Sequence, residues 1–322
     1  MKLNVAVIGA GAMGTAISQS IAENVNKLFL YARNKKICED INNNHYNSQY
    51  YPNLELKDNI IGINDFSKLN QVDVIFLCVP SSTIREITVE LNKVISKDCI
   101  LVNTAKGIEQ DTYKRMTEII EEITKRPPVA LSGPNIASEM AKNLSTATTI
   151  ACSNKNYLKI IEKTLKTKRF KVNSNTDVIG TEFCGIIKNV LAISQGICEG
   201  LDINANARFA LFTKSYSETK DLIELLGGER ETVDDYCGFG DIITASTLSV
   251  SRNHTLGVLY GQGIVVDEKS SGILFEGKNT AVILKKICED YNIKSLTVDF
   301  VYDIIVNKNN PKLAFNNFWE GL

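Results

Sequence analysis

The sequence predicts an α/β domain in the N-terminal half of the chain and an all-helical domain in the C-terminal half. Over residues 1–175, short apolar runs alternate with helix-compatible segments, a pattern typical of a parallel sheet covered by helices. Beyond residue 175 the strand-like runs become rare and helical periodicity dominates. Because 322 residues is a comfortable length for two domains, we expect them at 1–175 and 176–322.

A glycine turn follows the first apolar run, residues 3–8, and leads into a helix-compatible run. We call its six residues, Gly-Ala-Gly-Ala-Met-Gly at 9–14, the glycine loop. In this context Gly9 allows a sharp turn, Gly11 lets the backbone approach a pyrophosphate, and Gly14 lets the helix pack on the strand. The N–H groups at the start of the helix favour an anion. The pattern predicts a Rossmann-like dinucleotide-binding domain, and an incidental glycine turn is the alternative.

The residues after the second apolar strand, 27–31, bear on the type of dinucleotide. Sites for NAD usually place an acid there to hold the ribose 2′-hydroxyl. Here the strand continues into Ala-Arg-Asn-Lys-Lys, so Arg33 stands where the acid is expected. Its guanidinium could contact a 2′-phosphate or stack on the adenine. We therefore expect NADPH to be favoured without excluding NAD; the alternative is a solvated basic loop.

Further apolar strands are predicted at 72–80, 100–103, 129–132, 148–151 and 169–173. Lys106 follows the second of them, at the edge of a parallel sheet where ligands bind, so it is either an anion contact or a random loop charge. Gly133 lies in a turn that opens a helix. The intervening residues 38–70 are polar and rich in asparagine, and we expect His45 in a loop or at the surface.

Composition excludes several classes of function. The formal net charge of −1 gives no electrostatic case for binding nucleic acid. The eight cysteines are scattered without a C-x-x-C pair, which favours reduced thiols in a cytoplasmic protein. With only two histidines, a multi-histidine metal site is not expected. The N-terminus has no signal-peptide pattern, and no apolar run is long enough to predict an integral membrane segment.

The second half contains three groups of residues suited to chemistry. Lys188 lies inside the apolar helical run 180–193, where desolvation would lower its pKa toward neutral and make it an acid or base. The alternative is a lysine that snorkels from a helix edge. Glycines around Asp241 suggest a tight turn that points the carboxylate inward, and Ser-Arg-Asn at 251–253 could grip a phosphate or a carboxylate. A Glu-Gly pair at 276–277 precedes a further helix.

These groups belong to a longer set of motifs. In chain order they are Ala-Lys-Gly at 105–107, Ser-Gly-Pro-Asn-Ile-Ala-Ser-Glu at 132–139, Ile-Lys-Asn-Val-Leu-Ala at 187–192, Asn-Ala-Asn-Ala-Arg at 204–208, Gly-Asp at 240–241, Ser-Arg-Asn at 251–253 and Glu-Gly at 276–277. With this order and approximate spacing the chain resembles the NAD(P)-dependent glycerol-3-phosphate dehydrogenases, more the bacterial form than the animal one. The resemblance extends from the glycine loop to Glu276, nearly the whole chain.

The resemblance implies a two-domain enzyme that transfers hydride reversibly between NAD(P)H and dihydroxyacetone phosphate. It implies an active site in the cleft between the domains, a homodimer, and a product that feeds glycerophospholipid synthesis. Lys188 matches the catalytic lysine, with Asp241 expected to pair with it and Lys106 to polarise the carbonyl or bind substrate. Substrate positions are matched by Lys106, Gly133, Asn135, Lys188, Asp241, Ser251, Arg252 and Asn253. Cofactor positions are matched by Gly9, Gly11, Ala12, Met13, Gly14, Arg33, Lys106, Ala137, Arg252, Leu274 and Glu276.

The chain departs from the family pattern at three places. Ala245 stands where a threonine is usual, which puts one substrate hydrogen bond in doubt, although Thr244 and Thr247 are neighbours. Asn135 resembles the animal form, and Ala-Met at 12–13 replaces serine followed by an aromatic residue. Two alternatives remain open. One is a related hydroxyacid or ketopantoate-type reductase, and the other is a catalytically degenerate redox-sensing nucleotide-binding protein.

Overall fold

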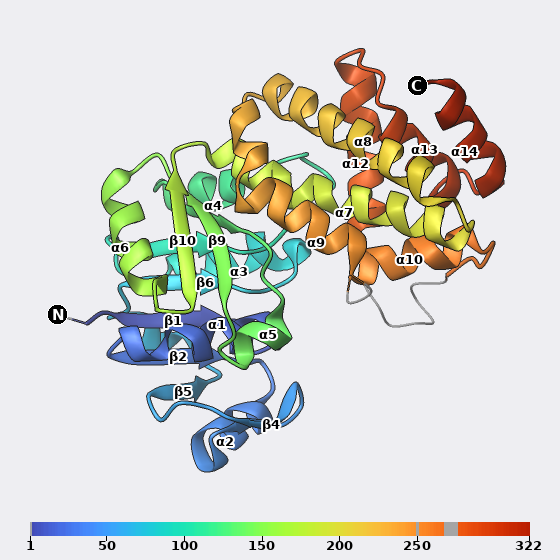
Figure 1. The fold of residues 1–322 in the computed structure, drawn as a ribbon. Coiled ribbons are helices and arrows are strands. Elements are labelled where there is room, and N and C mark those ends of the chain that lie inside the picture. Colours follow the sequence, from blue (N-terminus) through green and yellow to red (C-terminus); the bar gives the residue numbers. More distant parts are fainter. Residues whose placement is uncertain (1, 249–250, 267–275) are drawn as a thin grey trace. The chain divides into compact units, whose positions relative to one another are not determined.

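The chain divides into two compact units. The computed structural model describes residues 2–248, 251–266 and 276–322 (Figure 1). The first unit comprises Met1–Ala105 and Lys114–Val178, and the second comprises Lys106–Tyr113 and Ile179–Leu322. The segment Lys106–Tyr113 belongs to the second unit partly because Ile108 lies in the helical core. A contiguous division of the sequence does not anticipate this segment, and the boundary at 175/176 stays a prediction.

An eight-stranded sheet forms the centre of the first unit, in the order β10-β9-β8-β7-β6-β1-β2-β5. Neighbouring strands are parallel except β8 and β9, which are antiparallel. The predicted α/β class with a Rossmann-like domain is therefore confirmed. The strands are β1 (Asn4–Ile8), β2 (Lys27–Tyr31), β5 (Ile60–Ile63), β6 (Val74–Leu77), β7 (Ile100–Asn103), β8 (Val129–Ser132), β9 (Thr146–Ala151) and β10 (Phe170–Asn175).

Helices cover both faces of this sheet because successive side chains of a strand point to opposite faces. In β1, Val5 and Val7 belong to one apolar core and Ala6 and Ile8 to the other. The first core includes side chains of α1 (Ala12–Ile21), α2 (Lys35–Asn44), α5 (Ala137–Ala141) and α6 (Lys155–Leu165). The second core includes side chains of α3 (Ile84–Asn92) and α4 (Met116–Thr124). Burial on both faces explains why the inner strands have continuous apolar runs.

Residues 38–70 contain more regular structure than their polar composition suggests. Besides most of α2 and all of β5, they form a hairpin of β3 (Tyr46–Asn47) and β4 (Tyr51–Glu55) and a 3₁₀ turn, Phe66–Leu69. His45 caps the C-terminus of α2, where it adopts the left-handed conformation with φ 57° and is half-buried. Strands of two to five residues leave too short a run for periodicity to detect.

The glycine loop has the geometry that its glycines allow. Gly9 has φ +112°, a left-handed conformation that side chains rarely adopt. A methyl group on Gly14 would lie 1.9 Å from the Gly9 carbonyl oxygen, so α1 can start this close to β1 only with glycine there. A methyl group on Gly11 would meet nothing within 4 Å. Two glycines are therefore required by the turn, and the third faces open space.

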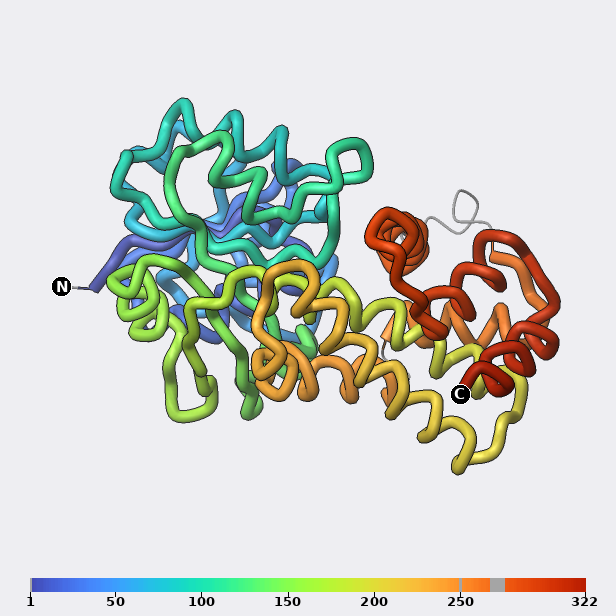
Figure 2. The backbone as a smooth tube through the Cα atoms, turned by 90° about the horizontal axis from the view of Figure 1, so that it is seen from above, coloured from blue at the N-terminus to red at the C-terminus, as the bar shows by residue number. Residues whose placement is uncertain are grey.

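From residue 179 onward, the regular elements of the second unit within its described residues are helices and short helical turns, as predicted. Figure 2 follows it from the yellow-green and gold helices α7 and α8 to the red helices α13 and α14. No helix in the described part of the chain is long and apolar enough to cross a membrane. The helices are α7 (Val178–Gly200), α8 (Ala205–Leu225), α9 (Asp241–Thr247), α10 (Arg252–Gly261), α12 (Glu276–Asp290), α13 (Leu296–Ile305) and α14 (Pro311–Glu320).

Helix α7 is the centre of this unit. Every residue from 180 to 198 is buried except Lys188, which is partly buried. Its C-terminal half contacts α10 backbone to backbone. A methyl group on Gly196 would lie 2.1 Å from the His254 carbonyl oxygen, and one on Gly257 would lie 2.2 Å from that of Ile193. A helix that is enclosed all round holds its side chains in fixed positions, so α7 is a rigid support for Lys188.

The glycine loop offers a matched test of this packing. Gly14→Ala should lower the free energy of unfolding of the first unit by about 1–3 kcal/mol, because the methyl group overlaps a carbonyl oxygen. Gly11→Ala should change it by less than about 1 kcal/mol, because the new methyl group meets open space and φ is ordinary. Urea unfolding followed by far-UV circular dichroism measures both; equal losses would contradict the predicted difference between the two positions.

Candidate active site

The carboxyl edge of the sheet presents the first group of predicted site residues. Strand β1 lies between β2 and β6, where the strand order changes direction, and the glycine loop leaves it at this point. Arg33 follows β2 and is exposed, Ala12 is exposed, and Met13 and Ala137 are half-buried. Gly11 precedes the first turn of α1, whose N–H groups have no partner within the helix. This edge can hold an anion.

The turn after β8 holds two further predicted residues, Gly133 and Asn135. The Asn135 amide nitrogen Nδ2 donates to the Ala147 carbonyl oxygen at 3.0 Å and to Thr146 Oγ1 at 3.2 Å. Its Oδ1 accepts from Thr148 Oγ1 at 3.0 Å. The Asn135 side chain therefore ties this turn to β9, a structural contribution that its sequence position did not reveal.

The second unit brings three predicted catalytic residues together. Asp241 accepts from two ammonium groups: Lys188 Nζ lies 3.1 Å from Oδ1, and Lys106 Nζ bonds to Oδ2. The Asp241 side chain is 5% exposed, that of Lys188 15% and that of Lys106 22%. Two ammonium groups therefore share one enclosed carboxylate. Such a cluster suits a substrate that carries or develops negative charge.

Burial lowers the pKa of Lys188 from its ordinary value, because an ammonium loses hydration inside the protein. The neighbouring charge of Lys106 lowers it further, whereas Asp241 and Glu276 oppose the shift. The predicted direction of the shift agrees with the structure. A lysine with a lowered pKa can give up and recover a proton closer to neutral pH than an exposed lysine.

Local structure around Asp241 differs from the predicted tight turn. Residues Tyr236–Gly240 form a π-helical turn that continues directly into α9, with Asp241 as the first residue of that helix. Gly238 allows the turn, since a methyl group there would lie 2.1 Å from the Val233 carbonyl oxygen. An acid in the first turn also interacts favourably with the helix dipole. The carboxylate is buried as expected, but by a helical turn.

The Ser-Arg-Asn motif lies at the start of α10. Ser251 caps this helix, with Oγ accepting from the His254 backbone N–H at 3.3 Å. Arg252 is exposed in the first turn. Asn253 Oδ1 accepts from the Gly277 N–H at 3.3 Å, so this side chain bonds to the first turn of α12. Glu276 begins α12, and the predicted cofactor residue Leu274 lies outside the described residues.

The threonine hydroxyls nearest to Ala245 bond to the backbone of their own segment. Thr244 Oγ1 donates to the Gly240 carbonyl oxygen at 2.7 Å, and Thr247 Oγ1 donates to that of Ile243 at 2.7 Å. Both hydroxyls thus donate to backbone carbonyls four residues earlier in the chain. The hydroxyl of Ser246 is buried and has no hydrogen-bond partner among the described atoms, a feature that the sequence did not indicate.

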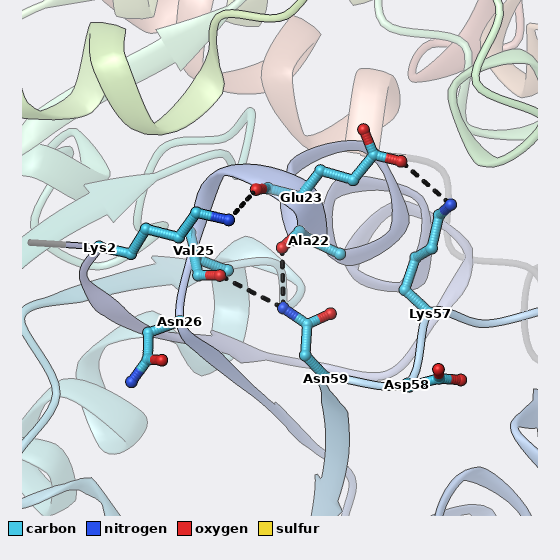
Figure 3. Close-up of a pocket in the computed structure, with 8 residues that line it drawn as sticks. All are labelled: Lys2, Ala22, Glu23, Val25, Asn26, Lys57, Asp58 and Asn59. Atoms are coloured by element: carbon cyan, nitrogen blue, oxygen red, sulfur yellow. Dashed lines mark hydrogen bonds and ion pairs between the residues drawn. The ribbon is translucent and has the colours of Figure 1, made fainter.

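A surface recess on the first unit has no place in this chemistry (Figure 3). It lies at the amino edge of β1, β2 and β5, opposite the glycine loop, and its polar groups largely bond to each other. Lys2 Nζ donates to the Glu23 carbonyl oxygen at 2.7 Å, and Asn59 Nδ2 donates to that of Ala22 at 2.8 Å. We assign no ligand to it.

A Rossmann-like unit with a glycine loop, and a helical unit with an enclosed lysine–aspartate cluster, define a dinucleotide-dependent reductase. Comparison with known proteins narrows this class. Residues 4–158 match the N-terminal model of NAD-dependent glycerol-3-phosphate dehydrogenase, and residues 177–316 match the C-terminal model. The chain belongs to this family.

Individual relatives agree with this assignment. Glycerol-3-phosphate dehydrogenase (NAD(P)+) of Clostridium botulinum (strain Eklund 17B / Type B) is 35% identical over 313 residues, 96% of this chain and 95% of the relative. The crystal structure of glycerol-3-phosphate dehydrogenase from Coxiella burnetii superposes with a TM-score of 0.91 at 29% identity, covering 99% of each chain. A ketopantoate reductase from Ralstonia eutropha, covering 98% of this chain and all of its own, reaches a TM-score of 0.62 at 12% identity and shows the fold alone.

The lysine cluster predicts opposite pKa changes in two variants. Asp241→Asn should lower the pKa of Lys188 further, because it removes the main opposing negative charge. Lys106→Met should raise it, because it removes a repelling cation. Carbon-13 NMR of labelled lysine side chains across a pH titration measures both; shifts in the same direction would contradict the charge assignment.

Proposed function

We propose that this chain reduces dihydroxyacetone phosphate reversibly to sn-glycerol 3-phosphate, with NADPH or NADH as hydride donor. The single observation that supports this most is the enclosed cluster of Lys106, Lys188 and Asp241 in a chain of this family. Family membership supports the substrate, a small phosphorylated ketone, and the cluster supplies an acid for its carbonyl oxygen. The product is a precursor of glycerophospholipids.

The first unit offers a site that fits a dinucleotide. Gly9 and Gly14 hold the turn, and Gly11 borders open space that a pyrophosphate could occupy next to the α1 N-terminus. Ala12 and Met13 begin α1 beside this space. A bound nicotinamide supplies the hydride of the reaction. The proposed cofactor contacts of Ala137, Lys106, Arg252, Leu274 and Glu276 rest on the resemblance to the family.

Lys188 is the proposed proton donor in the reducing direction. The alkoxide that forms on hydride transfer needs a proton, and the Lys188 ammonium is partly buried with a lowered pKa. In the oxidising direction the neutral amine takes the proton back. Asp241 orients this ammonium through Oδ1, and Lys106, on the other carboxylate oxygen, contributes positive charge toward the substrate oxygen.

The start of α10 is the proposed phosphate site. Arg252 is exposed in the first turn, where the helix dipole also favours an anion. The amide donors of Asn253 complete the fork, and Ser251 supports it by capping the helix. Binding the unreactive phosphate is how a small ketone is held in one productive orientation. Substrate contacts by Gly133 and Asn135 are proposed from the resemblance only.

Two broader properties are also proposals. A homodimer is proposed from the family resemblance, and light scattering after size-exclusion chromatography tests it. A cytoplasmic location is proposed because all eight cysteines are free thiols, which suits a reducing compartment. A ketopantoate-type reductase or a degenerate redox sensor would each fail to oxidise NADPH with dihydroxyacetone phosphate, so this one assay, run against ketopantoate, distinguishes the three.

Lys188→Met should lower kcat for dihydroxyacetone phosphate reduction by about 10²- to 10⁴-fold, because the forming alkoxide loses its proton donor. The rate of NADPH oxidation at saturating substrate and cofactor measures the loss. Lys312→Met, which changes an exposed lysine of α14, is the matched control and should retain full turnover. Near-normal turnover in Lys188→Met would remove the acid–base assignment.

The pH profile of kcat in the reducing direction should show an alkaline limb below the ordinary lysine pKa of 10.5. The acid must be protonated, so activity is present below the pKa of Lys188 and falls as the pH rises through it. Asp241→Asn should move this limb to lower pH, because it lowers that pKa further. A limb that stays in place in Asp241→Asn would show that another group controls it.

Arg33→Ala should weaken NADPH binding by about tenfold and NADH binding much less, because only NADPH carries the 2′-phosphate that the guanidinium would contact. Fluorescence titration with each cofactor measures both dissociation constants. Lys27→Ala, at the opposite end of the same strand, is the control and should leave both unchanged. Equal losses for the two cofactors would indicate stacking on the adenine instead.

A further inference from the structure

The hairpin β3–β4 lies against the start of α1 and the glycine loop. Its backbone is tied to α2, because the Ser48 N–H donates to Asp40 Oδ2 at 2.8 Å. It is tied to the last turn of α1, because Gln19 Nε2 donates to the Glu55 carbonyl oxygen at 3.1 Å. The hairpin is thus fixed at both ends, and its remaining polar contacts reach the loop itself.

Two side chains of the hairpin bond to backbone carbonyls of the loop. Asn47 is fully buried, and its Nδ2 donates to the Ala10 carbonyl oxygen at 3.0 Å and to Thr15 Oγ1 at 2.8 Å. Tyr51 Oη donates to the Ala12 carbonyl oxygen at 3.0 Å. Asn47 and Tyr51 are paired residues of the two strands, so one hairpin rung makes both contacts.

The contact to Ala10 sets the direction of a neighbouring donor. The Ala10 carbonyl and the Gly11 N–H belong to one peptide unit, which is planar and trans, so the two groups point in opposite directions. Holding the carbonyl toward Asn47 therefore turns the Gly11 N–H away from the hairpin. Glycine at position 11 leaves this peptide free to rotate unless something outside the loop restrains it.

The hydrogen-bonding groups of the Asn47 amide are only partly satisfied. Its Oδ1 is buried and has no hydrogen-bond partner among the described atoms. An unsatisfied buried acceptor destabilises the fold, whereas an apolar side chain of similar size would fill the same space without that cost. An asparagine at this position is therefore better explained by the two hydrogen bonds that its Nδ2 donates than by packing alone.

We propose that Asn47, assisted by Tyr51, is a positioning residue that orients the Gly11 N–H toward the pyrophosphate of the cofactor. This rests on the proposed function, because it assigns a ligand to the glycine loop. Asn47 acts through the peptide and does not touch the cofactor. The pyrophosphate is common to NADPH and NADH, so the effect of Asn47 is independent of the 2′-phosphate.

The test compares Asn47→Leu, Tyr51→Phe and a control, Asn59→Ala, in the full chain. Asn47→Leu should raise the dissociation constants of NADPH and NADH by the same factor, about tenfold, and leave KM for dihydroxyacetone phosphate and kcat at saturating cofactor within about twofold. Tyr51→Phe, which keeps the ring and removes one hydroxyl, should raise both constants by about twofold to threefold. Asn59→Ala removes a side-chain hydrogen bond to the Ala22 carbonyl oxygen, just beyond the other end of α1, and should leave both constants unchanged.

The outcomes separate the two levels of the proposal. If the unsubstituted chain binds neither NADPH nor NADH, the proposed function is wrong. If it binds both, and the folded Asn47→Leu and Tyr51→Phe variants bind as tightly, the positioning role is wrong. If Asn47→Leu weakens the binding of NADPH but not of NADH, the positioning role is also wrong. The same holds if kcat, substrate affinity and cofactor affinity all fall by the same factor. If Asn47→Leu does not fold, Tyr51→Phe decides alone, because its hydroxyl lies at the protein surface.

Discussion

The second unit depends on one enclosed carboxylate with two ammonium partners. Removing a charge from water is costly unless the charge is paired. The two ion pairs therefore stabilise the buried carboxylate of Asp241 and the partly buried ammonium groups of Lys106 and Lys188. The pairing also anchors the segment Lys106–Tyr113, distant in sequence, to the helices of this unit. Burial and the neighbouring charge of Lys106 lower the pKa of Lys188, whereas Asp241 and Glu276 oppose the shift.

In both units, contacts from a neighbouring element hold the backbone that carries a functional group. In the second, glycine contacts between α7 and α10 bring two helices together at backbone distance, which fixes the helix that carries Lys188. In the first, the Asn47 amide holds a peptide of the glycine loop. Glycine permits each close approach and removes a side chain that could supply stability, so neighbouring residues must provide the restraint.

The pattern of apolar residues predicted most strands of the sheet but not the short hairpin beside the glycine loop. Strands β2, β7 and β8 are found at the predicted residues, because buried parallel strands have continuous apolar runs. The β3–β4 hairpin was not predicted, since its strands are short and its sequence is polar. Asn135 and Ser246 illustrate the same limit at the site. Whether an amide or hydroxyl bonds to the backbone depends on neighbours that spacing along the chain does not specify.

By itself the sequence determined the α/β class, the glycine loop, the family motifs and the residue types available for proton transfer and anion binding. These follow from local periodicity and from residues that few other side chains can replace. Only the tertiary structure decided that Lys106 and Lys188 share one carboxylate, that Asp241 begins a helix, and that the hairpin of Asn47 supports the loop. The physical reason is that burial, and hence pKa and hydrogen-bond partners, arises from contacts between segments far apart in the chain.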